Sequence, residues 1–305
     1  MKQIIHYLQR HFQENKHPGL YGAWILMLIA LMTARYAYRW DLQWEGWTLN
    51  WLWKILFFTL PLAATIGMLV YYQKSFYILK KQDFQWLCLG ILCVLWANQY
   101  ALWYKYFLPI LPEYAQYFVG KLCFNVHVST FYILIPWLYG RFQNPESYQN
   151  FYGFTRKGFK PRPYMLMLLG MLPLLIWASF QEDFLVAYPR YRPGLLEVNT
   201  GIPSWLTVLV YEASYVLQFV ALEIFFRGFI VLNLGRYLGS GVVFPMVTVY
   251  MLIHFYKPLP ETIGSILGGY TLGVIAWYSR SVWGGILVHI GIALLMEALA
   301  FWQLG

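Results

Sequence analysis

The chain has 305 residues, of which 60% are hydrophobic and 21% aromatic, and only 11% are charged. Soluble domains carry about 25% charged residues, so this composition excludes a soluble globular protein and predicts an integral membrane protein. The formal net charge of +9 suits contact with anionic lipid head groups. Because the basic residues are scattered over short loops between apolar runs, a nucleic-acid partner is disfavoured.

A membrane-spanning helix needs about 20 mostly apolar residues. The pattern of apolar runs therefore predicts an all-α, polytopic transmembrane bundle with eight or nine spans. The candidate spans are 20–38, 51–73, 84–104, 117–140, 164–180, 203–233, 241–256, 262–278 and 282–303.

The loops between the runs predict orientation and organisation. Basic residues concentrate in alternate loops, which by the positive-inside rule places the N-terminus in the cytoplasm. The polar lead 1–19 precedes a full-length apolar run, so we expect a retained first span rather than a cleaved signal. The loop 141–163 divides an N-terminal four-helix region, 1–160, from a core, 161–305, that holds most of the polar residues inside spans.

An ion pair is the first polar feature inside these spans. Glu223 and Arg227 are four residues apart, so they share a helix face and can neutralise each other. A charged side chain at a helix centre costs about 2.5–3.5 kcal/mol on insertion scales. Such a pair persists either because it fixes helix packing or because it performs chemistry, and spacing alone leaves both open.

Two histidines follow in the later spans. His254 comes one turn after Tyr250, and His289 lies about two turns into the last span, with Glu297 eight residues further along. Taken singly, each histidine fits a hydrogen-bonded packing role. From the helical rise, Glu223 and the two histidines lie roughly 10–20 Å deep, so they could meet. A carboxylate with two imidazoles could activate a water or bind a metal.

These stretches, in this order, resemble the CAAX protease and bacteriocin-processing family of intramembrane proteases over about residues 205–300. The family pattern is Glu-Glu-x-x-x-Arg, then Phe-x-x-x-His, then His-x-x-x-Asn. Glu223 and Arg227 match the second Glu and the Arg of the first motif. Tyr250 and His254 match the second motif with an aromatic change, and His289 matches the third.

Two positions depart from the family pattern. Leu222 stands where the family has its first Glu, usually assigned as the catalytic base. Ala293 stands where the family has its Asn, usually assigned to help hold the oxyanion. Leucine cannot accept a proton and alanine cannot donate a hydrogen bond, so the family mechanism cannot transfer whole.

The resemblance implies an intramembrane peptidase of the bacterial inner membrane, acting on a membrane protein or a lipidated peptide. Glu223 would be the base, and Arg227 would hold it ionised. His254 and His289 would orient the water or stabilise the oxyanion, with Glu297 as a further carboxylate.

Other classes of function stay open. The same cleft could serve a catalytically inactive scaffold, or an immunity or chaperone-type protein. Paired ions inside spans also mark ion pathways, so a transporter is a third class. It is less favoured because transporters often contain a duplicated half, and none is visible in the sequence. No cofactor is expected. Zinc at His254 and His289 stays open, although a third ligand with zinc-type spacing is missing.

Overall fold

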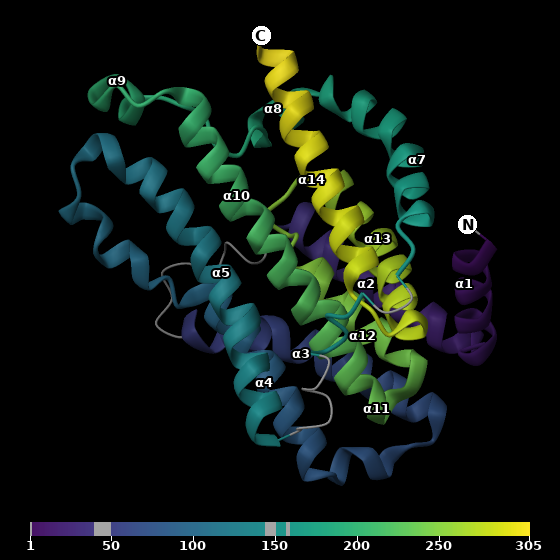
Figure 1. Cartoon of the computed structure of the whole chain (residues 1–305). Coiled ribbons are helices and arrows are strands. Elements are labelled where there is room, and N and C mark those ends of the chain that lie inside the picture. The colour runs from purple at the N-terminus through teal and green to yellow at the C-terminus, as the bar shows by residue number, and fades with distance from the viewer. Residues whose placement is uncertain (1, 40–49, 144–150, 157–158) are drawn as a thin grey trace.

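The computed structural model describes residues 2–39, 50–143, 151–156 and 159–305 (Figure 1). These residues form helices and no strand, which confirms the predicted all-α fold. The predicted boundary loop 141–163 lies partly outside the described residues. The α-helices are α1 (Lys2–Glu14), α2 (Pro18–Tyr36), α3 (Asn50–Gln73), α4 (Gln82–Tyr100), α5 (Glu113–Gln143), α7 (Arg162–Ser179), α8 (Glu182–Ala187), α9 (Leu195–Thr200), α10 (Ser204–Glu223), α11 (Gly235–Leu238), α12 (Val243–Leu252), α13 (Leu259–Ser279) and α14 (Trp283–Leu304). Short 3₁₀ turns cover η1 (Phe76–Lys80), η2 (Trp103–Tyr106), η3 (Leu108–Ile110) and η5 (Gly239–Val242), and a π-helix covers η4 (Ile224–Leu234).

Seven helical stretches of the described residues are long and apolar enough to cross a membrane, and the chain is a multi-pass membrane protein. The predicted spans 203–233 and 241–256 are joined in one of them, Ser204–Leu252, which folds back around α11 and η5. Helix α13 forms over the predicted span 262–278 but is not among the seven, because Gly, Ser and Thr dilute its apolar residues. The stretch Ser204–Leu252 thus covers the predicted spans 203–233 and 241–256, and α13 covers the predicted span 262–278.

The π-helix η4 starts directly after Glu223 and contains Arg227. In a π-helix each N–H bonds the carbonyl five residues earlier, so more residues fit in a turn than in an α-helix. Such helices are rare and occur frequently at functional sites. Nothing in the sequence pattern of the run 203–233 predicted this change of winding.

Helix α12 is short. Its 10 residues extend about 15 Å, which is half of a bilayer core of about 30 Å. Helices α12 and α13 pack against each other, and the turn between them carries His254. Helix α12 alone is therefore too short to cross a bilayer, and His254 lies just beyond its last residue.

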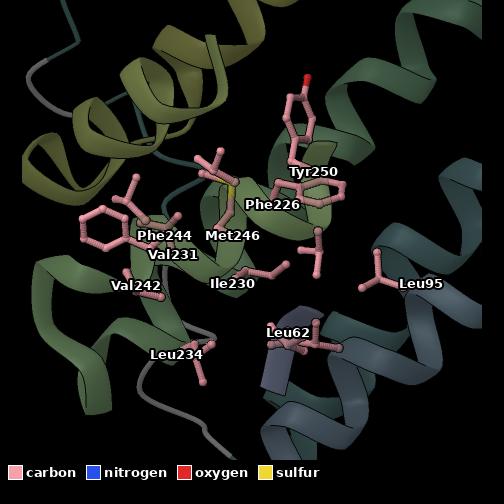
Figure 2. Packing of buried hydrophobic residues seen from close by; sticks show 14 of the residues in the cluster. Leu62, Leu95, Phe226, Ile230, Val231, Leu234, Val242, Phe244, Met246 and Tyr250 are labelled. Carbon is pink, nitrogen blue, oxygen red and sulfur yellow. The ribbon is translucent and has the colours of Figure 1, made fainter. Parts of the chain in front are cut away.

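The main apolar cluster lies where η4, α12, α3 and α4 meet. Figure 2 shows Leu62 of α3 and Leu95 of α4 on one side, with Phe226 and Ile230 of η4 and Tyr250 of α12 on the other. All five are buried. The cluster thus contains residues from both predicted regions, and the boundary near residue 160 stays a prediction.

Helix α1 lies across one end of the bundle, against α13 and η5 (Figure 1). Its fully buried His11 lies with Nδ1 2.8 Å from the Tyr270 hydroxyl and Nε2 3.0 Å from the Ser240 carbonyl oxygen. Asn15, just after α1, donates to the Ser240 hydroxyl at 2.9 Å. The segment expected only to be a polar lead is therefore anchored by hydrogen bonds to the C-terminal half of the chain.

Candidate active site

The centre of the candidate site is the buried carboxylate of Glu223, at the last position of α10. Glu223 Oε1 lies 2.9 Å from His289 Nδ1 of α14 and 3.0 Å from Arg227 Nη1 of η4. The Glu223 side chain is 0% exposed and that of Arg227 1%, whereas that of His289 is 15% exposed. Because a carboxylate only accepts, His289 donates from Nδ1, and in the neutral imidazole Nε2 is then the acceptor. The most accessible group of the three is therefore the imidazole.

A glycine on α14 makes room for this carboxylate. Gly285 lies one turn before His289, and a Cβ placed on it would overlap Glu223 Oε2 and stand 2.9 Å from Glu223 Cδ. Close approach of α10 and α14 at this point therefore requires a residue without a side chain. No sequence pattern linked Gly285 to Glu223, and their contact became visible only in the fold.

Arg227 has a second contact on its other side. Its guanidinium carbon lies 4.3 Å from the centroid of the Tyr250 ring, a cation–π contact. None of its nitrogens has a well-aligned hydrogen-bond partner among the described residues, and neither does Glu223 Oε2. The closest polar partner of Arg227 is the Glu223 carboxylate, because Arg227 Nη1 lies 3.0 Å from Glu223 Oε1. The pair thus keeps N–H groups and one carboxylate oxygen that are not fully used in well-aligned bonds to the described residues.

Tyr250 and His254 complete the group. The Tyr250 hydroxyl lies 3.4 Å from His289 Nε2. The half-buried His254 donates from Nδ1 to the Tyr250 carbonyl oxygen at 2.7 Å, and the two rings are 4.7 Å apart. This bond leaves Nε2 of His254 as a free acceptor. The structure therefore brings four predicted site residues together: Glu223, Arg227, His289 directly, and His254 through Tyr250.

Glu297 lies elsewhere, in a second polar cluster. Its two carboxylate oxygens accept from the backbone N–H of Arg190 at 3.1 and 3.0 Å, and its carboxyl is in contact with that of Glu212. Both Glu212 oxygens are buried without a donor among the described residues. Two turns of α14 separate Glu297 from His289, so Glu297 has no contact with Glu223.

Lys257 and Glu261 extend this cluster toward His254. Lys257 Nζ lies 3.0 Å from Glu261 Oε1 and 3.1 Å from the Tyr188 hydroxyl, which donates to Glu261 at 3.2 Å. Sequence reasoning missed this cluster. Glu212 gave the same signal as Glu223, an acid inside the run 203–233, and could have been found by that rule.

Leu222 and Ala293, the two positions that depart from the family pattern, are both buried in apolar surroundings. Leu222 is 6% exposed and belongs to the main apolar cluster. Ala293 is 4% exposed and packs with Tyr211 and Tyr215 between α10 and α14. No group of three His, Cys, Asp or Glu that could hold a metal ion occurs in the part of the chain that the structure describes.

One comparison with known proteins found a relation. Residues 203–295 of the 305 match the family model described as type II CAAX prenyl endopeptidase Rce1-like. No curated protein and no solved structure matches the chain. The matched segment contains Glu223, Arg227, His254 and His289, and it confirms the predicted resemblance to the CAAX protease family.

Proposed function

We propose, from the relation of residues 203–295 to the CAAX protease family, that the chain is an intramembrane peptidase that hydrolyses a peptide bond of a membrane protein or a prenylated peptide. The observation that carries the proposal is the 2.9 Å contact between Glu223 Oε1 and His289 Nδ1 inside the membrane. A buried carboxylate that holds an imidazole in one tautomer is the arrangement that turns histidine into a general base.

The reaction follows from this geometry. Water attacks the peptide carbonyl carbon while His289 Nε2 takes its proton, and Glu223 stabilises the resulting imidazolium. Collapse of the tetrahedral intermediate breaks the C–N bond, and His289 returns the proton to the leaving amine. Glu223 thus acts through His289, and Arg227 pairs with the Glu223 carboxylate at 3.0 Å. The exposed fraction of His289, larger than those of its two partners, favours it as the residue that meets water.

His254 and Glu297 have separate places in the proposal. The Nε2 atom of His254, whose ring lies 4.7 Å from that of Tyr250, would be a second acceptor for the water. Glu297 is a further carboxylate between α10 and α14, away from Glu223, and it accepts a hydrogen bond from the Arg190 backbone N–H. Because no third ligand was predicted, and the described residues contain no group of three His, Cys, Asp or Glu that could hold a metal ion, we expect activity to survive dialysis against a chelator.

Substrate would reach the site from the cytoplasmic leaflet or laterally from lipid. The site lies toward the end of the bundle where α1 packs on η5 and on the last turns of α13. With the N-terminus in the cytoplasm of a bacterial cell, as the loop charges predict, that end faces the cytoplasm. Labelling of a cysteine placed at exposed Gln3, in a variant without the native cysteines, tests this orientation in intact and broken cells.

The test of the function uses purified protein in liposomes with quenched-fluorescent transmembrane and farnesylated peptides. We expect Glu223→Gln and His289→Ala to abolish cleavage while the protein keeps its helical spectrum and its elution volume. Exposed Glu182→Gln and His6→Ala are the matched controls and should cleave at the parent rate. Parent-like cleavage by both site variants would refute the proposal.

A non-catalytic scaffold is the second candidate. It is favoured by Leu222 and Ala293, which leave the family's first acid and its amide without a counterpart. A scaffold would retain peptide in the liposomes without product after prolonged incubation. Saturable peptide binding by the parent, with no cleavage across the panel, would decide for it.

A further inference from the structure

The Tyr250 hydroxyl is a polar group that the proposed reaction has not yet used. Tyr250 is 4% exposed, and its ring packs edge-on against Phe226, with centroids 5.0 Å apart. In Figure 2 the ring stands at the edge of the apolar cluster, with its oxygen directed away from the other labelled side chains. The apolar part of the side chain is therefore fixed in the core, and the hydroxyl is held outside it.

The hydroxyl lies beside the proposed base. Its oxygen is 3.4 Å from His289 Nε2, the nitrogen that would take the proton of the water. A hydrogen bond from a hydroxyl is normally about 2.7–3.0 Å long, so this contact is too long to satisfy the hydroxyl fully. The hydroxyl of a buried tyrosine usually has a hydrogen-bond partner. The Tyr250 hydroxyl instead has only a long contact to His289 Nε2, so its O–H can turn to another acceptor.

The guanidinium of Arg227 acts on the same phenol. It lies over the ring face at 4.3 Å from the centroid and in electrostatic contact with the hydroxyl. A cation in this place draws electron density from the phenol and strengthens the O–H as a donor to negative charge. The His254 bond to the Tyr250 carbonyl, 2.7 Å long, restrains the backbone of the same residue.

We propose that the Tyr250 hydroxyl is the oxyanion donor of the peptidase, an inference that rests on the function proposed above. When the water attacks, the carbonyl oxygen of the substrate becomes negatively charged. The Tyr250 hydroxyl, which lies beside His289 Nε2, is then within reach of that oxygen. Tyr250 then donates its O–H to that oxygen without losing the proton, and the donor becomes free again when the C–N bond breaks. This supplies a hydrogen bond that Ala293 cannot give.

A tyrosine donor of this kind acts on the transition state and hardly on the bound substrate. Its loss should lower kcat and leave KM nearly unchanged. Removal of one oxyanion donor typically costs about 10²–10³ in kcat. A structural role would instead change stability and affect kcat and KM together through a misplaced His289.

The experiment compares Tyr250→Phe with Tyr152→Phe in the liposome assay. Tyr152 is a matched control: it is 2% exposed, belongs to the same apolar cluster, and donates its hydroxyl to the Pro136 carbonyl oxygen at 3.0 Å. We expect about a 100-fold lower kcat for Tyr250→Phe at unchanged KM, and parent kinetics for Tyr152→Phe. Equal kcat values for the two variants would overturn the proposal.

A second measurement covers the case in which Tyr250→Phe does not fold. Fluorotyrosine at position 250 keeps the shape and makes the hydroxyl more acidic. We expect the alkaline limb of the kcat profile to move to lower pH, because an ionised phenol cannot donate; an unmoved limb contradicts the role. Failure of the function itself has a different signature, namely a parent that does not cleave or a His289→Ala variant that cleaves normally, and an inactive parent contradicts both proposals.

Discussion

Gly285 and Glu223 occupy one space from two helices: the carboxylate of Glu223 fills the volume where a side chain of residue 285 would lie. The Glu223–His289 contact depends on this, because His289 is one turn further along the same helix. A requirement for glycine at a helical position otherwise carries an entropic cost. Its presence here is explained by the approach of a charged group to α14.

Gly285→Ala should therefore displace Glu223 from His289. We expect a loss of most peptidase activity and a lower unfolding free energy, by about 1–3 kcal/mol as for other overpacked cores. Gly268→Ala in α13 is the control, since nothing lies within 4 Å of a Cβ at that position. Activity and thermal unfolding in detergent measure both effects. Unchanged activity in Gly285→Ala would show that the contact is not needed.

The Glu223–Arg227 pair should show strong energetic coupling. Removal of one partner leaves a buried charge alone, which costs about 3–5 kcal/mol. The losses of unfolding free energy in Arg227→Met and Glu223→Gln should therefore add up to more than the loss in the double variant. The exposed pair Arg10–Glu14 has the same spacing and a similar distance, 2.8 Å, and serves as the control cycle. Unfolding in detergent gives both coupling energies. Equal coupling in the two cycles would mean that burial adds nothing.

The Glu212–Glu297 contact predicts a stabilising substitution. Two carboxyls in contact repel when both are ionised, and their mutual hydrogen bond requires a proton on one of them. Glu212→Gln supplies an amide donor to Glu297 and should raise stability by about 1 kcal/mol. Glu297→Ala should do the reverse, because it leaves the Arg190 N–H without its acceptor. A lower unfolding temperature for Glu212→Gln would contradict this account.

The attachment of α1 should weaken in acid. Burial lowers the pKa of His11 from 6.5 to about 4, so the folded state binds this proton less readily than the unfolded state. The stability from this group is present above about pH 6.5 and is lost as the pH falls toward 4, at about 1.4 kcal/mol per pKa unit. Hydrogen exchange of α1 amides, corrected for intrinsic rates, should increase over this range.

His11→Gln provides the control for the acid effect. Glutamine has no proton to gain, so the exchange of α1 should become independent of pH across the same window. Exposed His6 lies on the same helix, and His6→Gln should leave the pH dependence as in the parent. If His11→Gln retains the full pH dependence, another group controls the attachment.

The sequence predicted the fold class well because the physical signal is strong. Runs of about 20 apolar residues have few alternatives to spanning helices, and those over α2, α3 and α14 became helices at nearly the predicted bounds. The meeting of Glu223 with His289 was also predictable, since intramembrane ionisable residues rarely persist without a partner. The π-helix was not, because its winding depends on packing around η4 and not on local composition.

Contacts between distant segments account for the other differences. His11 bonds Ser240 and Tyr270, which are 229 and 259 residues away, so no local pattern in the polar lead could show its anchor. Spacing placed Glu297 on the His289 face, and in the structure both residues contact side chains of α10. Helical spacing could not show the partner of Glu297, because its carboxylate accepts from the backbone of Arg190, which lies 107 residues earlier in the chain.

The π-winding after Glu223 makes this part of the chain sensitive to length. Deleting one residue between Ile224 and Arg227 would move each later side chain by one position, which is about 100° around the axis of an α-helix. The guanidinium of Arg227 would then leave its place over the Tyr250 ring, although every side chain named in the site would still be encoded. Insertions and deletions here would be more damaging than most single replacements, and the chemistry depends as much on a count of residues as on their identity.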